Sequence, residues 1–238
     1  MQAKDRIVLA LDVDNPEKAL ELVSRLKDHV GAFKIGMQLY NSVGPDILEK
    51  INEGGSRVFL DLKFHDIPNT VGAVSRVAAR RGCWMFNVHA AGGAAMMTAA
   101  AQSSREEASK TGKNPPLVLG VTVLTSLSQD QLNAEIGIPG SVEEVVSRWA
   151  LLAKESGLDG VVASPREVKA IRQTCGNDFL IVTPGVRPLW AGTQDQKRVT
   201  TPREAVDSGA DYLVIGRPIT GADDPIEAAQ RIIKELEE

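Results

Sequence analysis

Residues 55–88 read GSRVFLDLKFHDIPNTVGAVSRVAARRGCWMFNV and contain the repeating unit from which the fold can be predicted. A short apolar run, Val58 to Leu62, is followed by an amphipathic segment long enough for a helix, and a second apolar run begins at Met85. Gly55 and Gly82 stand just before the two runs, where a glycine can take the left-handed conformation that ends a helix. The stretch therefore predicts a strand, a helix and a second strand.

The same unit recurs along the whole chain. Runs that are apolar at nearly every position suit parallel strands covered on both faces. Gly31, Gly157 and Gly209 precede three of them, as expected of helix-ending glycines. The eight runs are Ile7 to Leu11, Ala32 to Ile35, Val58 to Leu62, Met85 to Val88, Leu117 to Val121, Gly160 to Ala163, Leu180 to Thr183 and Tyr212 to Ile215.

Eight such units in 238 residues predict one α/β domain, a (β/α)₈ TIM barrel over residues 1–238. An open doubly wound sheet is disfavoured because it usually has fewer strands and a glycine-rich phosphate loop after the first. Here the first strand is followed by Asp12, Val13 and Asp14, without glycine. The longest connection, residues 122–159, is interpreted as an active-site loop at about 126–139 followed by a helix.

Capping motifs mark where several helices should begin. Asn15-Pro16, Ser164-Pro165, Thr201-Pro202 and Asp224-Pro225 each pair a capping residue with a first-turn proline. The last three add a glutamate at the capping-box position. We therefore expect helices to start at all four.

Composition excludes several classes of protein. The formal net charge is −4 with no block of five or six like charges, which argues against nucleic-acid partners and anionic membranes. No apolar run approaches the ~18 residues of a membrane-spanning helix, and no signal-peptide core follows Met1. Two isolated cysteines and three scattered histidines give neither a disulfide framework nor zinc spacing. A cytoplasmic enzyme is the simplest prediction.

Charged side chains gather at the carboxyl ends of the first three predicted strands, the end that forms the active site of such barrels. Asp12 closes the first strand, Lys34 lies in the second, and Asp61 and Lys63 end the third. Side chains alternate along a strand, so Asp61 and Lys63 should share the face toward the barrel mouth. The structural alternative is an ion-pair network whose only role is to close the barrel. Four charges converging on one end favour function.

Gly216-Arg217 follows the last strand, where barrels often bind a phosphate through backbone N–H groups and an arginine. A phosphorylated substrate is therefore predicted. His65 and His89 are interpreted as packing or hydrogen-bonding residues, and Cys83 and Cys175 as inert thiols.

Residues 61–70, DLKFHDIPNT, closely resemble the orotidine 5'-phosphate decarboxylase family, whose members form UMP at the end of pyrimidine synthesis. The resemblance covers essentially the whole chain. It continues through residues 9–12 (LALD), 33–36 (FKIG), 121–126 (VTVLTS), 183–188 (TPGVRP), 195–198 (DQKR) and 215–220 (IGRPIT).

The resemblance implies a homodimer that decarboxylates orotidine 5'-phosphate without metal or any other cofactor. Lys63 would be the catalytic acid, within an alternating tetrad of Lys34, Asp61, Lys63 and Asp66. Asp66 would reach into the partner subunit's site.

The resemblance also implies the binding residues. Asp12 would bind the ribose hydroxyls, Ile67 and Thr70 would assist the partner's site, Thr125 and Pro184 would line the pyrimidine pocket, and Arg187, Gln196, Gly216 and Arg217 would take the phosphate. Residues 187–196 would act as a closing loop. Leu189 and Trp190 depart from the family by their bulk, which affects the expected loop dynamics.

Three alternatives are kept. A related 3-keto-L-gulonate 6-phosphate decarboxylase uses Mg²⁺ and an acidic residue where this chain has Lys34, whose charge would repel the ion. A Schiff-base aldolase would need a neutral Lys63, which flanking carboxylates disfavour. A phosphoribosyl-ligand sensor would suit a chain that lacks one of the tetrad charges.

Overall fold

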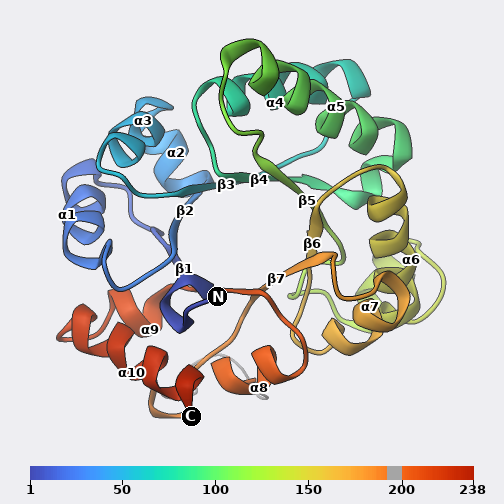
Figure 1. Cartoon of the computed structure of the whole chain (residues 1–238). Coiled ribbons are helices and arrows are strands. Elements are labelled where there is room, and N and C mark those ends of the chain that lie inside the picture. Colours follow the sequence, from blue (N-terminus) through green and yellow to red (C-terminus); the bar gives the residue numbers. More distant parts are fainter. Residues whose placement is uncertain (192–199) are drawn as a thin grey trace.

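The computed structural model describes residues 1–191 and 200–238, and within them eight parallel strands close into a barrel (Figure 1). Each strand pairs with the next along the chain, and the last returns to pair with the first. The strands are β1 (Ile7–Ala10), β2 (Ala32–Gly36), β3 (Val58–Phe64), β4 (Met85–His89), β5 (Leu117–Val121), β6 (Gly160–Val162), β7 (Leu180–Pro184) and β8 (Tyr212–Ile215). The predicted (β/α)₈ barrel is confirmed.

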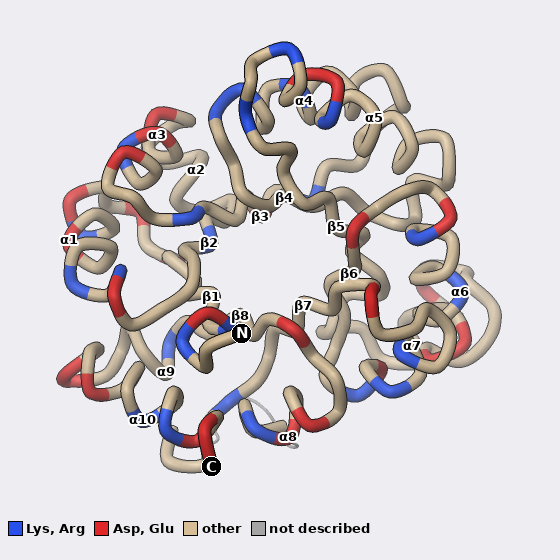
Figure 2. Tube along the Cα trace, viewed as in Figure 1, with Lys and Arg blue, Asp and Glu red and all other residues tan. Residues whose placement is uncertain are grey.

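Helices surround the barrel (Figure 1), and along them Lys and Arg are interspersed with Asp and Glu (Figure 2). They are α1 (Pro16–Leu26), α2 (Met37–Val43), α3 (Asp46–Glu53), α4 (Pro68–Arg80), α5 (Gly93–Thr111), α6 (Val142–Glu155), α7 (Val168–Cys175), α8 (Pro202–Asp207), α9 (Arg217–Thr220) and α10 (Pro225–Glu237). Short 3₁₀ turns are η1 (Ala3–Arg6), η2 (Ala90–Gly92) and η4 (Leu189–Ala191), and η3 (Gln131–Glu135) is a π-helical turn within the predicted active-site loop. Over the described ranges, no helix has the length and hydropathy needed to cross a membrane.

Two apolar layers hold the fold together because side chains alternate along each strand. Ile7 and Leu9 belong to the large cluster between barrel and helices, whereas Val8 between them belongs to a separate cluster inside the barrel. The inner cluster consists of Val8, Ala32, Phe59, Met85, Leu119, Val182 and Tyr212. Phe59 also lines the pocket above, so this apolar plug forms part of its floor.

Local sequence signals located most of the predicted helix starts and ends, with two exceptions. Thr201 forms the predicted capping box with Glu204, but Ser164 does not start a helix: α7 begins only at Val168, after a turn. Gly31 is also not a left-handed helix end. A Cβ at Gly31 would lie 2.3 Å from the carbonyl oxygen of Asp5, so its glycine is required by close backbone contact instead.

Candidate active site

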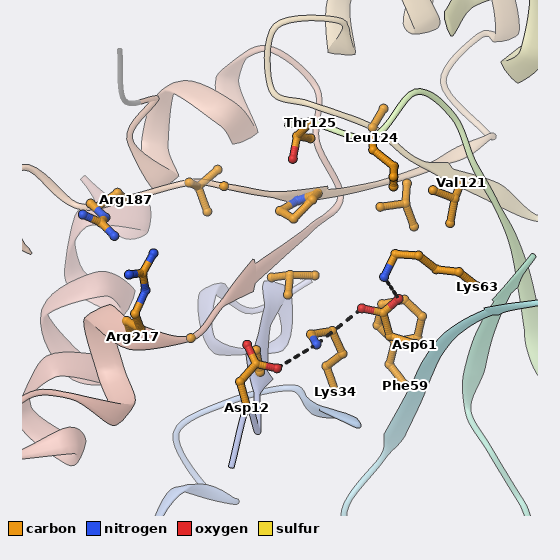
Figure 3. A pocket seen from close by; sticks show the side chains of 18 of the residues that line it. Asp12, Lys34, Phe59, Asp61, Lys63, Val121, Leu124, Thr125, Arg187 and Arg217 are labelled. Atoms are coloured by element: carbon orange, nitrogen blue, oxygen red, sulfur yellow. Dashed lines mark hydrogen bonds and ion pairs between the residues drawn. The ribbon is translucent and has the colours of Figure 1, made fainter. Parts of the chain in front are cut away.

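A pocket of about 350 Å³ opens at the carboxyl ends of the strands, the end predicted from the sequence, and its size suits a small ligand (Figure 3). Its lining comes from seven of the eight strands or the segments that follow them. Nine of the predicted site residues are among the lining: Asp12, Lys34, Asp61, Lys63, Thr125, Pro184, Arg187, Gly216 and Arg217.

Four charged side chains form a continuous array of alternating sign along one wall of the pocket (Figure 3). Lys34 Nζ lies 3.2 Å from Asp12 Oδ1 and 3.3 Å from Asp61 Oδ2. Lys63 Nζ lies 2.7 Å from Asp61 Oδ1. Asp61 therefore stands between two ammonium groups, and each of its oxygens contacts one of them.

The Asp61 carboxyl is largely buried, and burial alone would raise its pKa. The charges of Lys34 and Lys63 and hydrogen bonds from Lys63 and Asn87 outweigh that effect and hold the pKa below its ordinary value. The site consequently keeps a carboxylate ionised in a confined space.

Lys63 reaches the pocket in a backbone conformation that strand periodicity does not predict. It is the one non-glycine residue with positive φ in residues 1–191 and 200–238, at φ 53°. That left-handed conformation costs a residue with a side chain roughly 1–2 kcal/mol. The expected convergence of Asp61 and Lys63 is present, but an irregular strand produces it in place of simple alternation.

The irregularity is visible in the register of β3 against β4. Leu60 pairs with Phe86 and Phe64 pairs with Val88, so three residues of β3 lie opposite Asn87 alone. Such a bulge bends the strand and redirects its side chains. Asn87 was not among the predicted site residues, although a lone polar residue at an inward position of an apolar strand could have marked it.

Gly36, at the end of β2, keeps space for the array. A Cβ built there would lie 3.0 Å from Lys34 Nζ and 3.5 Å from Asp12 Oδ1. A side chain at this position would crowd the ammonium group between its two carboxylates. Gly36 is thus a second residue of the site that the prediction missed, although it stands inside a quoted motif.

Two arginines lie on the other side of the pocket from Lys63 (Figure 3). Arg187 is buried, and its backbone N–H donates to the carbonyl of Thr200 across the base of the connection between β7 and α8. Arg217 begins the short helix α9, directly after Gly216. Two guanidinium groups at the ends of β7 and β8 form a setting suited to a phosphate.

The remaining predicted residues fall in three places. Thr125 and Pro184 line the pocket. Asp66, Ile67 and Thr70 do not line it; they are exposed, and the Asp66 carboxylate accepts a hydrogen bond from the N–H of Ile67. Gln196 lies outside the described residues.

A wider cavity of about 760 Å³ adjoins the pocket and shares Thr125 and Pro184 with it. Much of its remaining lining comes from residues 126–129 of the predicted active-site loop and from the segment 164–167, together with Val142 and Thr200. Among the described residues, no three His, Cys, Asp or Glu side chains are grouped to hold a metal ion.

His89 provides a test of the local electrostatics. Burial lowers its pKa, and the charges of His65 and Lys63 lower it further, against a smaller opposing effect of Asp61. Its ring lies 5.2 Å from that of His65. The unfolded chain therefore binds a proton at His89 more readily than the folded one.

We expect the free energy of unfolding to be at its full value above the unfolded pKa of about 6.5 and to fall as the pH drops toward the lower folded pKa. One such group contributes a slope of at most about 1.4 kcal/mol per pH unit. Urea unfolding of wild type and His89→Gln from pH 7 to pH 5 measures how the free energy of unfolding changes with pH in each protein. The variant should lose less stability, whereas His29→Gln, which leaves His89 in place, should behave as wild type. Equal slopes in all three proteins would contradict the assignment.

Comparison with known proteins gives a consistent set of relatives. The family model described as "Orotidine 5'-phosphate decarboxylase / HUMPS family" matches residues 5–232. A protein of Syntrophomonas wolfei named orotidine 5'-phosphate decarboxylase is 60% identical over 239 residues, covering 100% of both chains. One of that name from Heliobacterium modesticaldum is 56% identical, covering 100% of this chain and 98% of the relative.

Solved structures agree with these relatives. The crystal structure of orotidine 5'-phosphate decarboxylase from Lactobacillus acidophilus superposes with a TM-score of 0.87 at 39% identity, covering 98% of this chain and 99% of the other. The enzyme of that name from Pyrococcus horikoshii gives a TM-score of 0.75 at 28% identity, covering 98% of this chain and 99% of the other.

Proposed function

The chain belongs to the orotidine 5'-phosphate decarboxylase / HUMPS family, and we propose from its own residues how it removes CO₂ from orotidine 5'-phosphate to form UMP. It is a carboxy-lyase of pyrimidine biosynthesis. The observation that carries the mechanism is the arrangement of one pocket: an array of four alternating charges on one side and two arginines on the other. A nucleotide has matching parts, a reactive ring and a remote phosphate.

The proposed orientation follows from charge. The phosphate lies at Arg187, Gly216 and Arg217, and the pyrimidine reaches past Thr125 and Pro184 toward Lys63. Asp12 contacts Lys34 through Oδ1 and lines the pocket with an exposed carboxylate, so it is placed to accept hydrogen bonds from the ribose hydroxyls. The ring carboxylate at C6 then stands beside the Asp61–Lys63 pair.

Decarboxylation breaks the bond from C6 to the carboxylate carbon and leaves the electron pair on C6. No carbonyl is placed next to that carbon to delocalise the charge, so electrostatic stabilisation by fixed groups must lower the barrier. The Lys63 ammonium supplies it and then transfers a proton to C6, which gives UMP and a neutral lysine. Solvent returns the proton to Lys63 before the next turnover.

Asp61 and Lys34 prepare Lys63 for this role. Asp61 contacts the Lys63 ammonium at 2.7 Å and is itself fixed by Lys34 at 3.3 Å, so the charges are in place before substrate arrives. Asp61 close to the departing carboxylate also destabilises the bound substrate. Binding energy at the distant phosphate holds the ring against this unfavourable contact.

The proposal includes a homodimer in which Asp66 of each chain completes the tetrad of the other. Within the described chain, Asp66 is exposed and no ion pair joins it to either lysine of the array, and residues 67–70 after it are exposed as well. The cytoplasm is the proposed compartment, where pyrimidine nucleotides are consumed.

We expect decarboxylation to proceed without metal, because the Lys34 ammonium occupies the place of the acidic ligand of the Mg²⁺-dependent alternative. The test follows the loss of orotidine 5'-phosphate absorbance with protein treated with excess EDTA. Full activity is expected. Activity that disappears with EDTA and returns with added Mg²⁺, or turnover of 3-keto-L-gulonate 6-phosphate in place of the nucleotide, would favour the alternative enzyme.

A further inference from the structure

We propose that Asn87 is the positioning residue of the Asp61–Lys63 pair. Its buried side-chain amide hydrogen-bonds to Asp61 and to the backbone of Lys63, and the reaction depends on these two hydrogen bonds. The inference rests on the proposed function, in which this pair performs the chemistry. It concerns a residue that is not among those that line the pocket.

One amide makes both contacts. The Nδ2 of Asn87 donates to Asp61 Oδ1 at 2.7 Å, and its Oδ1 accepts the backbone N–H of Lys63 at 2.8 Å. The side chain is buried, with 1% of its surface exposed. Asp61 Oδ1 thereby receives hydrogen bonds from both Asn87 and the Lys63 ammonium, at 2.7 Å each.

The register of the sheet explains why this position needs a side chain of this kind. Residues 61–63 of β3 lie opposite Asn87 alone, so the bulge leaves backbone groups of β3 without regular ladder partners. The Asn87 oxygen replaces the missing partner for the Lys63 N–H. It thereby supports the left-handed backbone conformation, φ 53°, from which the Lys63 side chain reaches Asp61.

Few side chains could do the same work. A carboxamide both donates and accepts and carries no charge, so it holds a carboxylate without altering the charge balance of the array. Aspartate has nearly the same shape but can only accept when ionised, and it would place a second negative charge beside Asp61. Leucine has a similar volume and can make neither hydrogen bond.

The experiment compares Asn87→Asp, Asn87→Leu and a matched control, Asn52→Leu. Asn52, on α3, also donates two hydrogen bonds through Nδ2, to the carbonyls of Arg81 and Gly82, but it lies outside the pocket lining. Asn87→Ser, which is smaller and still polar, replaces the leucine variant if that protein does not fold. Thermal unfolding establishes that each variant is folded at the assay temperature.

Two readouts separate positioning from mere stability. Steady-state kinetics with orotidine 5'-phosphate should show kcat lowered about 100-fold in both Asn87 variants, as expected for a small misplacement of reacting groups, with KM close to the wild-type value. The carbon-13 signal of the Asp61 carboxyl, assigned by its absence in Asp61→Asn, should titrate at a higher pH in Asn87→Leu than in wild type, because a hydrogen bond that lowers the pKa has been removed.

The control should lose thermal stability but keep the wild-type kcat and the wild-type titration of Asp61. The inference is overturned if a folded Asn87 variant matches the control in kcat and in the Asp61 titration. A wild-type protein that leaves orotidine 5'-phosphate unchanged would instead contradict the proposed function, while the titration would still report whether Asn87 holds Asp61.

Discussion

Replacing Lys63 with methionine is expected to lower kcat for orotidine 5'-phosphate by roughly 10⁴- to 10⁷-fold. Two losses multiply: general acid catalysis contributes about 10²- to 10⁴-fold, and one preorganised electrostatic contact about 10²- to 10³-fold. Methionine has an unbranched side chain of similar length and lacks the ammonium group. Lys63→Ala should have the same effect on turnover.

Binding should distinguish loss of chemistry from loss of the site. UMP lacks the carboxylate, and the arginines proposed to bind its phosphate lie on the opposite side of the pocket from Lys63 (Figure 3). Its affinity measured by calorimetry should therefore remain near that of wild type in Lys63→Met. Lys50→Ala, at an exposed position on α3, serves as the control and should keep full activity. Turnover near the wild-type rate in Lys63→Met would place the acid at another residue.

The second large effect is expected at the phosphate. Arg217→Ala should lower kcat/KM roughly 30- to 5,000-fold, which corresponds to a loss of about 2–5 kcal/mol of transition-state stabilisation. The reason is that the variant leaves the substrate phosphate without one of its charged partners. Binding energy at this remote group supports the chemistry at C6, so kcat should fall as well as KM rise.

A truncated substrate isolates the contact. Orotidine, which has no phosphate, is expected to react slowly with the wild-type protein and no more slowly with Arg217→Ala, since the contact is absent in both. Arg25→Ala, an exposed arginine on α1, should match wild type with both substrates. An equal penalty for orotidine and its phosphate ester would show that Arg217 acts on the fold and not on the phosphate.

The sequence predicted the architecture because its signals are local and repeated. Eight apolar runs with intervening amphipathic segments indicated a closed barrel. The capping box of Thr201 and Glu204 located the first residue of α8 correctly. Ser164 carried a similar signal and was wrong, because the chain forms a turn there before α7 begins at Val168. A capping motif shows that a helix can start, while packing decides whether it does.

The residues of the charged array could be predicted from the sequence, but their arrangement in space could not. Asp12, Lys34, Asp61 and Lys63 were identified from their places at the strand ends, and the pocket brings them together. Three further predicted residues, Asp66, Ile67 and Thr70, lie outside that pocket in the single chain, and their proposed role across a dimer stays a prediction.

Residue type and spacing along the chain were enough to predict which elements form, in what order they pair and which strand ends carry charge. How Lys63 meets Asp61 could be seen only in the folded chain. A bulge in β3 and a hydrogen bond from the Lys63 N–H to Asn87, 24 positions away, accompany that contact, and a hydrogen bond between such distant residues exists only after the barrel places β3 beside β4. Side-chain alternation predicts the faces of a single strand, whereas the contact of Lys63 with Asp61 involves the register between β3 and β4.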